Sequence, residues 1–156
     1  MNIENDEQYR RELIYRKGNS KAIINKYRKK ISSLVNIDES KIKTLSLRST
    51  DKIIDSQKKQ RRMCGKEKCP PDKIGHLLEI ECSLPGGYYV FIDNDWKYCG
   101  CFFVNSLSVL NKDFTFGNDI VNGIFFISED LCHLIDLDYY EEGSFFYIEK
   151  TTFEII

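Results

Sequence analysis

Residues 88–104, with the sequence YYVFIDNDWKYCGCFFV, carry the strongest β-hairpin pattern in the chain. The flanking segments 88–92 and 96–104 are rich in aromatic and β-branched residues, which favour strands. Between them, Asp93-Asn94-Asp95 is typical of a turn. We therefore expect the two segments to pair as antiparallel strands. An isolated hairpin is not stable in water, so this one needs further strands beside it.

Further strand patterns continue toward the C terminus. The segments predicted as strands are 77–82, 107–110, 114–116, 124–127, 135–140 and 144–149, with 151–156 as an additional edge strand. Ser128-Glu129-Asp130 predicts the start of a short helix that ends at His133. Short connections between these segments favour a meandering, mainly antiparallel sheet.

The residues before this sheet show helical spacing instead. We predict one helix over 6–17 that Gly18 ends, a second over 20–35 that Ser20 caps, and a third that begins at Thr50 and carries Lys58 to Arg62 near its end. Residues 36–49 fit a short strand or an extended linker. The predicted fold class is α+β, with N-terminal basic helices packed on or beside a C-terminal, mainly antiparallel β-sheet.

Charge divides the chain at about residue 76. Residues 1–76 hold 20 Lys and Arg against 10 Asp and Glu, whereas residues 77–156 hold 3 against 14. The acidic part also holds all ten Phe, the single Trp and six of the nine Tyr. We predict a single domain over 1–156, with a basic helical part over 1–70 and an acidic, aromatic-rich β part over 71–156.

The sequence predicts no targeting signal and no membrane partner. Its N terminus lacks a basic segment followed by an apolar one, and no apolar run approaches the ~18 residues of a membrane span. Six unevenly spaced cysteines in 156 residues are unlike the dense disulfide framework of a small secreted domain. We expect a cytoplasmic protein.

One candidate partner-binding segment is acidic and rich in tyrosine. It consists of Asp136, Asp138, Tyr139, Tyr140, Glu141 and Glu142. Tyrosine rings provide rigid contact area and carboxylates attract a basic partner, which is why this composition suits protein binding. The alternative is an ordinary exposed turn whose tyrosines flank the core.

The basic part provides a second candidate site, for nucleic acid. Its residues are Lys26, Arg28, Lys29, Lys30, Lys58, Lys59, Arg61 and Arg62. Side chains of this kind contact phosphates, although this stretch lacks the aromatic residues that stack on single-stranded bases. The alternative is a solvated helical face, or charge complementarity with the acidic sheet.

Two weaker patterns suggest metal chemistry. Cys64, Cys69, His76 and Cys82 are zinc-type ligands, but the Cys-x4-Cys spacing is looser than the usual knuckle. Asp72, Asp95 and Lys97 resemble the carboxylates and lysine of a metal-dependent nuclease, although Asp95 falls in the predicted hairpin turn. We expect no metal, no other cofactor and no enzymatic activity.

These patterns favour a protein that acts by binding another, basic protein. The predicted role is an inhibitor or immunity protein, an antitoxin that covers a basic toxin or nuclease with its acidic, aromatic face. Nucleic-acid binding through the basic helices is the alternative.

Overall fold

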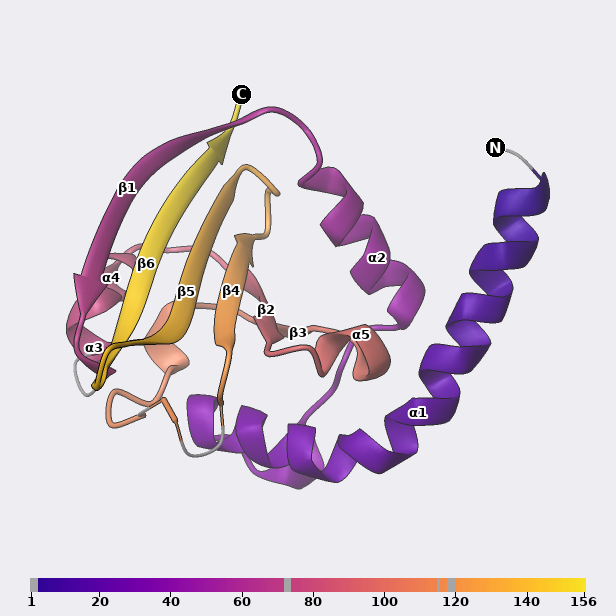
Figure 1. The fold of residues 1–156 in the computed structure, drawn as a ribbon, viewed down its shortest axis with the longest axis horizontal. Helices are drawn as coiled ribbons and strands as arrows, with labels where there is room; N and C mark the ends of the chain where they lie inside the picture. The colour runs from indigo at the N-terminus through magenta and orange to yellow at the C-terminus, as the bar shows by residue number, and fades with distance from the viewer. Residues whose placement is uncertain (1–2, 72–73, 115, 118–119) are drawn as a thin grey trace.

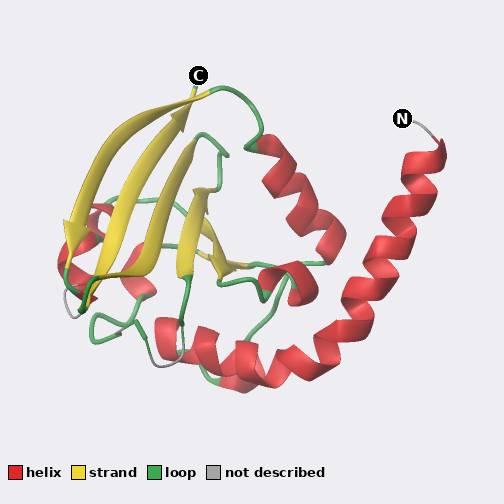
Figure 2. Ribbon diagram, viewed as in Figure 1, coloured by secondary structure: helices red, strands yellow, loops and turns green. Residues whose placement is uncertain are grey.

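The computed structural model describes residues 3–71, 74–114, 116–117 and 120–156. It has an α+β fold, as predicted: a long N-terminal helix and further short helices surround one antiparallel sheet (Figures 1 and 2). The sheet has six strands in the order β1-β6-β5-β4-β2-β3. The strands are β1 (Arg61–Cys69), β2 (Tyr88–Ile92), β3 (Phe102–Val104), β4 (Gly123–Ser128), β5 (His133–Glu142) and β6 (Phe145–Ile155).

The helices differ from prediction mainly in where they begin and end. One bent helix, α1 (Ile3–Val35), replaces the two helices expected over 6–17 and 20–35 (Figure 1). Gly18 does not end it, because a glycine inside a helix costs only about 1 kcal/mol. Ser20 does not cap a second helix either, since its hydroxyl donates to the carbonyl of Lys17 within α1.

The third predicted helix starts earlier and ends sooner. Helix α2 (Leu47–Ser56) begins three residues before Thr50, because the Ser46 side chain accepts a hydrogen bond from the Ser49 amide and caps it. Arg61 and Arg62 are not on this helix but on β1. A short η1 (Glu39–Lys41) and an isolated bridge between Thr44 and Phe102 occupy the connection before α2.

The predicted hairpin forms, but with a longer connection. Strands β2 and β3 pair with Tyr88 opposite Val104, as the pattern predicts. Residues 96–99, however, form a helical turn, α5 (Trp96–Cys99), in place of the start of a strand. Gly100 ends this turn at φ +86°, and a Cβ there would lie 2.0 Å from the carbonyl oxygen of Leu45. Only glycine fits this backbone.

Four other predicted elements are wrong. Residues 77–82 are helical, as the end of α3 (Ile74–Leu77) and most of α4 (Glu79–Ser83), because the Cys82 amide bonds to the Leu78 carbonyl four residues back. Residues 107–110 contain the 3₁₀ turn η3 (Leu107–Val109), and Phe114 and Phe116 pack in the core outside any strand. The expected helix after Ser128 is a tight turn, since Leu131 has a left-handed backbone with φ 66°.

The strands of the last hairpin are longer than predicted, and a different strand lies at the edge of the sheet beside it. β5 and β6 pair from His133 opposite Glu154 to Glu142 opposite Phe145. Residues 151–155, expected at an edge, continue β6 inside the sheet. The strand at the edge beside β6 is β1, which comes from the basic part of the chain. Its arginines and lysines discourage pairing with a further strand.

The two faces of the sheet are covered differently. We call one the α1 face: Val90, Phe126, Ile135, Leu137 and Ile148 pack there with the second half of α1 and with α3 and α4. The other is the α2 face, where Ile53 of α2 packs with Phe91, Ile127 and Leu134. Near the β5–β6 turn, the α2 face bears exposed side chains, including Asp138, Glu142 and Phe145.

Candidate functional site

Strand alternation divides the predicted partner-binding segment between the two faces of the sheet. Asp136, Asp138, Tyr140 and Glu142 lie on the α2 face, because residues two apart in a strand point the same way. Tyr139 and Glu141 lie on the opposite face. The Tyr139 ring stacks between Phe116 and Phe146, with centroids 5.8 and 5.5 Å away, so Tyr139 packs at the margin of the core.

Three residues of β6 join the four on the α2 face. Glu149 lies opposite Asp138, Tyr147 opposite Tyr140, and Phe145 opposite Glu142. The Tyr140 and Tyr147 rings are 6.0 Å apart, and Phe145 remains 65% exposed. We name these seven residues the acidic aromatic face: Asp136, Asp138, Tyr140, Glu142, Phe145, Tyr147 and Glu149. The alternation in 145–149, combined with the predicted hairpin, was the signal that could have found the β6 members.

Lysines of β1 compensate only part of this negative charge. Lys68 pairs with Glu142 at 3.3 Å and Lys66 pairs with Glu149 at 3.2 Å. The Lys68 ammonium also lies 5.7 Å from the centre of the Tyr140 ring. Neither Asp136 nor Asp138 has a hydrogen-bond or ion-pair partner within the described part of the chain. Two adjacent carboxylates of the face are therefore outside these ion pairs.

Burial and neighbouring negative charge raise the pKa of both groups. Partial burial, together with the negative charge of Asp138, raises the pKa of Asp136 to about 6, and the positive charge of Arg61 only partly opposes this. Partial burial and the charge of Glu149 also raise the pKa of Asp138. In the folded protein, ionised Asp136 is thus in an unfavourable environment that a nearby cation would improve.

The predicted nucleic-acid residues do not form one surface. Lys26, Arg28 and Lys29 are exposed on the second half of α1, whereas Lys58 and Lys59 follow α2 and Arg61 and Arg62 begin β1. Figure 1 shows these two regions at different ends of the molecule. Arg62 also pairs with Glu154.

Lys30, the remaining residue of that set, is buried. Its ammonium lies 2.7 Å from Asp93 and 3.0 Å from Asp95, and its side chain is 7% exposed. Asp93 also accepts backbone hydrogen bonds from Asn122 and Gly123 at 2.7 and 3.1 Å. This network joins α1 to the β2–β3 connection, so Lys30 holds the structure together and cannot reach a phosphate.

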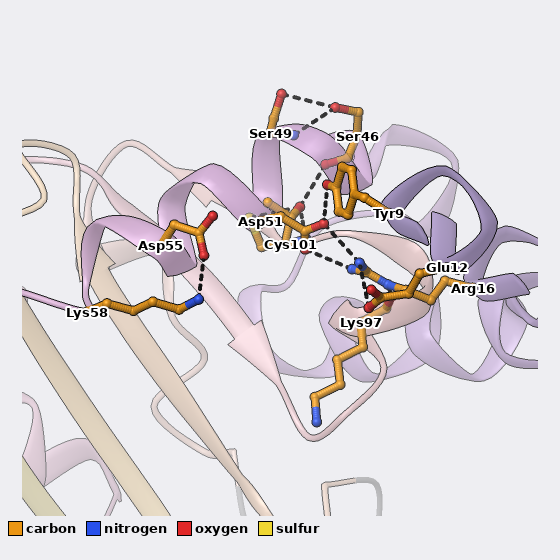
Figure 3. Close-up of polar contacts among 11 residues, drawn as sticks. Tyr9, Glu12, Arg16, Ser46, Ser49, Asp51, Asp55, Lys58, Lys97 and Cys101 are labelled. Carbon is orange, nitrogen blue, oxygen red and sulfur yellow. Dashed lines mark hydrogen bonds and ion pairs between the residues drawn. The ribbon is translucent and has the colours of Figure 1, made fainter. Parts of the chain in front are cut away.

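The structure does not bring the nuclease-like residues together. Asp72 lies outside the described residues, and Asp95 points to Lys30 inside the molecule. Lys97 instead points outward, away from the contact between Asp51 and Arg16 (Figure 3).

The zinc-type residues also fail to meet. Cys64 is exposed on β1, while Cys82 donates to the Leu107 carbonyl from α4. Over the described residues, no group of three or more His, Cys, Asp or Glu side chains is arranged to hold a metal ion.

A groove of about 610 Å³ separates the first half of α1 from α2 and α5. Its polar centre is Asp51, which takes a two-pronged contact from the Arg16 guanidinium at 2.9 Å on each oxygen and a hydrogen bond from Tyr9 (Figure 3). Arg16 also donates to the Lys97 carbonyl. Because Asp51 and Arg16 satisfy each other, these contacts explain how the protruding half of α1 is held against α2.

The fold and the site define a small α+β protein with an antiparallel sheet, one half of which presents charged and aromatic side chains. Comparisons with protein-family models, with curated proteins and with solved structures found no match. Among the helices in the described ranges, none has the length and apolar character to cross a membrane.

Proposed function

We propose that this protein acts by binding another protein through the acidic aromatic face, as an inhibitor or immunity protein of a basic toxin or nuclease. The observation that supports the proposal is the pair of carboxylates, Asp136 and Asp138, that make no ion pair within the described part of the chain, although lysines of β1 pair with their neighbours. A lysine or arginine of a partner would remove this unfavourable charge on binding.

The aromatic residues of the face support the same function. Exposed Phe145 and half-buried Tyr140 and Tyr147 lie together beside the carboxylates. Aromatic residues of this kind are typical of those that dominate binding energy. The lysines of β1 lie at the margin of the face, where they restrict which arrangements of positive charge can bind.

The test is retention of a partner from native lysate on three immobilised proteins, with and without nuclease treatment. These are the wild type, Tyr140→Ala on the face, and Glu141→Gln on the opposite side of the same strand. We expect one basic protein to be retained by the wild type and by Glu141→Gln, insensitively to nuclease. Tyr140→Ala should weaken retention at least tenfold, as for a central aromatic residue.

The opposite result would assign the function elsewhere. Equal retention by Tyr140→Ala and the wild type would exclude the acidic aromatic face. Retention that disappears after nuclease treatment, and that requires Lys26, Arg28 and Lys29, would instead support nucleic-acid binding by α1.

A further inference from the structure

A small pocket adjoins the acidic aromatic face where β5 passes beneath the end of α2. Its volume is about 380 Å³, and its lining includes Ile54, Gln57, Phe125, Leu134, Asp136 and Phe153. Asp136 belongs both to this pocket and to the face, so a partner that covers the face lies at the mouth of the pocket.

Two side chains that line the pocket, Asp136 and Gln57, carry acceptors without a donor among the described residues, and the Gln57 oxygen is buried. Asp136 has no partner, as described above. Gln57 is only 8% exposed, and its side-chain oxygen accepts no hydrogen bond. Its amide nitrogen donates to Ser56 Oγ and to the Leu131 carbonyl, both at 3.1 Å, which fixes the orientation of the side chain. A buried acceptor without a donor is unfavourable, and a ligand that carries N–H groups would satisfy it.

The aromatic walls suit a flat cation. Phe125 is stacked on Phe91 with a centroid distance of 4.4 Å and meets the edge of Trp96, so its ring is held firmly. Another ring of the lining already takes such a group: the Arg61 guanidinium lies 4.7 Å from the centre of the Phe153 ring. A guanidinium stacks on aromatic rings more readily than an ammonium does, because it is planar and weakly hydrated.

We infer that this pocket receives an arginine side chain of the partner protein, with its guanidinium against the aromatic lining and its N–H groups toward Asp136 and Gln57. Five N–H donors on a planar fork match a carboxylate and an amide oxygen better than the three donors of lysine. This inference rests on the proposed function and adds the residue type that anchors the partner.

Two cations of the chain, Lys58 and Arg61, also line the pocket and make a second expectation possible. Lys58 pairs with Asp55 at 2.9 Å, so part of its charge is compensated. Arg61 makes no ion pair with another described residue, and its guanidinium occupies the face of the Phe153 ring. Arg61 therefore competes with an incoming arginine, both for the ring and for the charge of Asp136.

The test is titration of the ¹⁵N-labelled protein with N-acetyl-arginine amide, followed by NMR. N-acetyl-citrulline amide, which has nearly the same shape without the charge, is the control ligand. We expect saturable shifts of the Gln57 side-chain NH₂ with a Kd on the order of 1 mM for the arginine compound, because a ligand this small binds weakly. The citrulline compound should bind at least tenfold more weakly.

Two variants locate the binding in the pocket. Asp136→Asn should weaken arginine binding at least tenfold, whereas Arg61→Ala should strengthen it about threefold or more because a competing cation is gone. Unchanged amide spectra elsewhere establish that each variant is folded. Equal binding of the two compounds, or equal binding by Asp136→Asn and the wild type, would overturn the inference.

The inference and the proposed function fail in different ways. If the arginine compound does not bind but a partner is still retained in a manner that depends on Tyr140, the partner uses the face without this pocket. If the arginine compound binds and no partner depends on Tyr140, the pocket stands and the proposed function fails.

Discussion

Replacing Asp136 with Asn is expected to stabilise the protein at neutral and alkaline pH. The unfolded chain gives an Asp carboxyl a pKa of about 3.9, and the folded structure raises that of Asp136 to about 6. At about 1.4 kcal/mol per pH unit, the difference corresponds to about 3 kcal/mol. Because Asp136 is half-buried and solvent screens part of its charge, we expect a gain of about 1–3 kcal/mol from the neutral amide.

The pH dependence has a definite sign. With a raised pKa, the folded state binds more protons than the unfolded state between about pH 4 and pH 6. The contribution of Asp136 to stability therefore falls as pH rises through this window and stays constant above it. The advantage of Asp136→Asn should be absent at pH 4 and complete at pH 7.5.

Urea denaturation of the wild type and the variant at both pH values measures this difference directly. Glu141→Gln is the matched control, since Glu141 is exposed on the same strand and should change stability by no more than about 0.5 kcal/mol. The reasoning would be refuted if Asp136→Asn destabilised the protein at pH 7.5, or if its effect were the same at the two pH values.

Three further substitutions test other parts of the structure. Lys30→Met leaves the carboxylates of Asp93 and Asp95 buried without their cation and should lower the free energy of unfolding by about 3–5 kcal/mol. The exposed control Lys26→Met should lower it by less than about 0.5 kcal/mol, and urea denaturation measures both. Tyr139→Ala should lower the free energy of unfolding by about 2–4 kcal/mol because it removes a ring stacked between two others. Tyr140→Ala should lower it by less than half as much. Equal effects would contradict the assignment of the two tyrosines to opposite faces of the sheet. Gly100→Ala should lower the thermal midpoint of unfolding by at least about 5 °C, because the φ of +86° and the nearby Leu45 carbonyl leave no room for a Cβ. An unchanged midpoint would show that this backbone conformation is not required.

The sequence was sufficient for elements that local pattern specifies. The pairing of 88–92 with 102–104 and the hairpin of β5 with β6 follow from alternation and turn residues, and both were predicted. Helical spacing likewise predicted most of α1 and α2. Boundaries were less secure, as at Gly18, because one glycine inside a helix costs only about 1 kcal/mol and does not end it.

The kind of residue in the candidate site was predictable from the sequence, but which residues share one face of the sheet was not. The acidic tyrosine segment was visible in the sequence, yet only strand alternation in the folded sheet separates Tyr140 from Tyr139 and brings in Tyr147 and Glu149 from β6. Gln57 and Asp136 are 79 positions apart in the sequence, and nothing local relates them before α2 is placed over β5.

The sequence by itself determined the α+β class, the antiparallel pairing of its strongest strands and the division of charge between the two parts of the chain. Only the tertiary structure decided how those charges are used. It placed β1 beside β6, where lysines neutralise Glu142 and Glu149, and it buried Lys30 between Asp93 and Asp95. The physical reason is that the environment of a charge depends on burial and on neighbours distant in sequence, whereas local pattern reports only which face of an element a residue occupies.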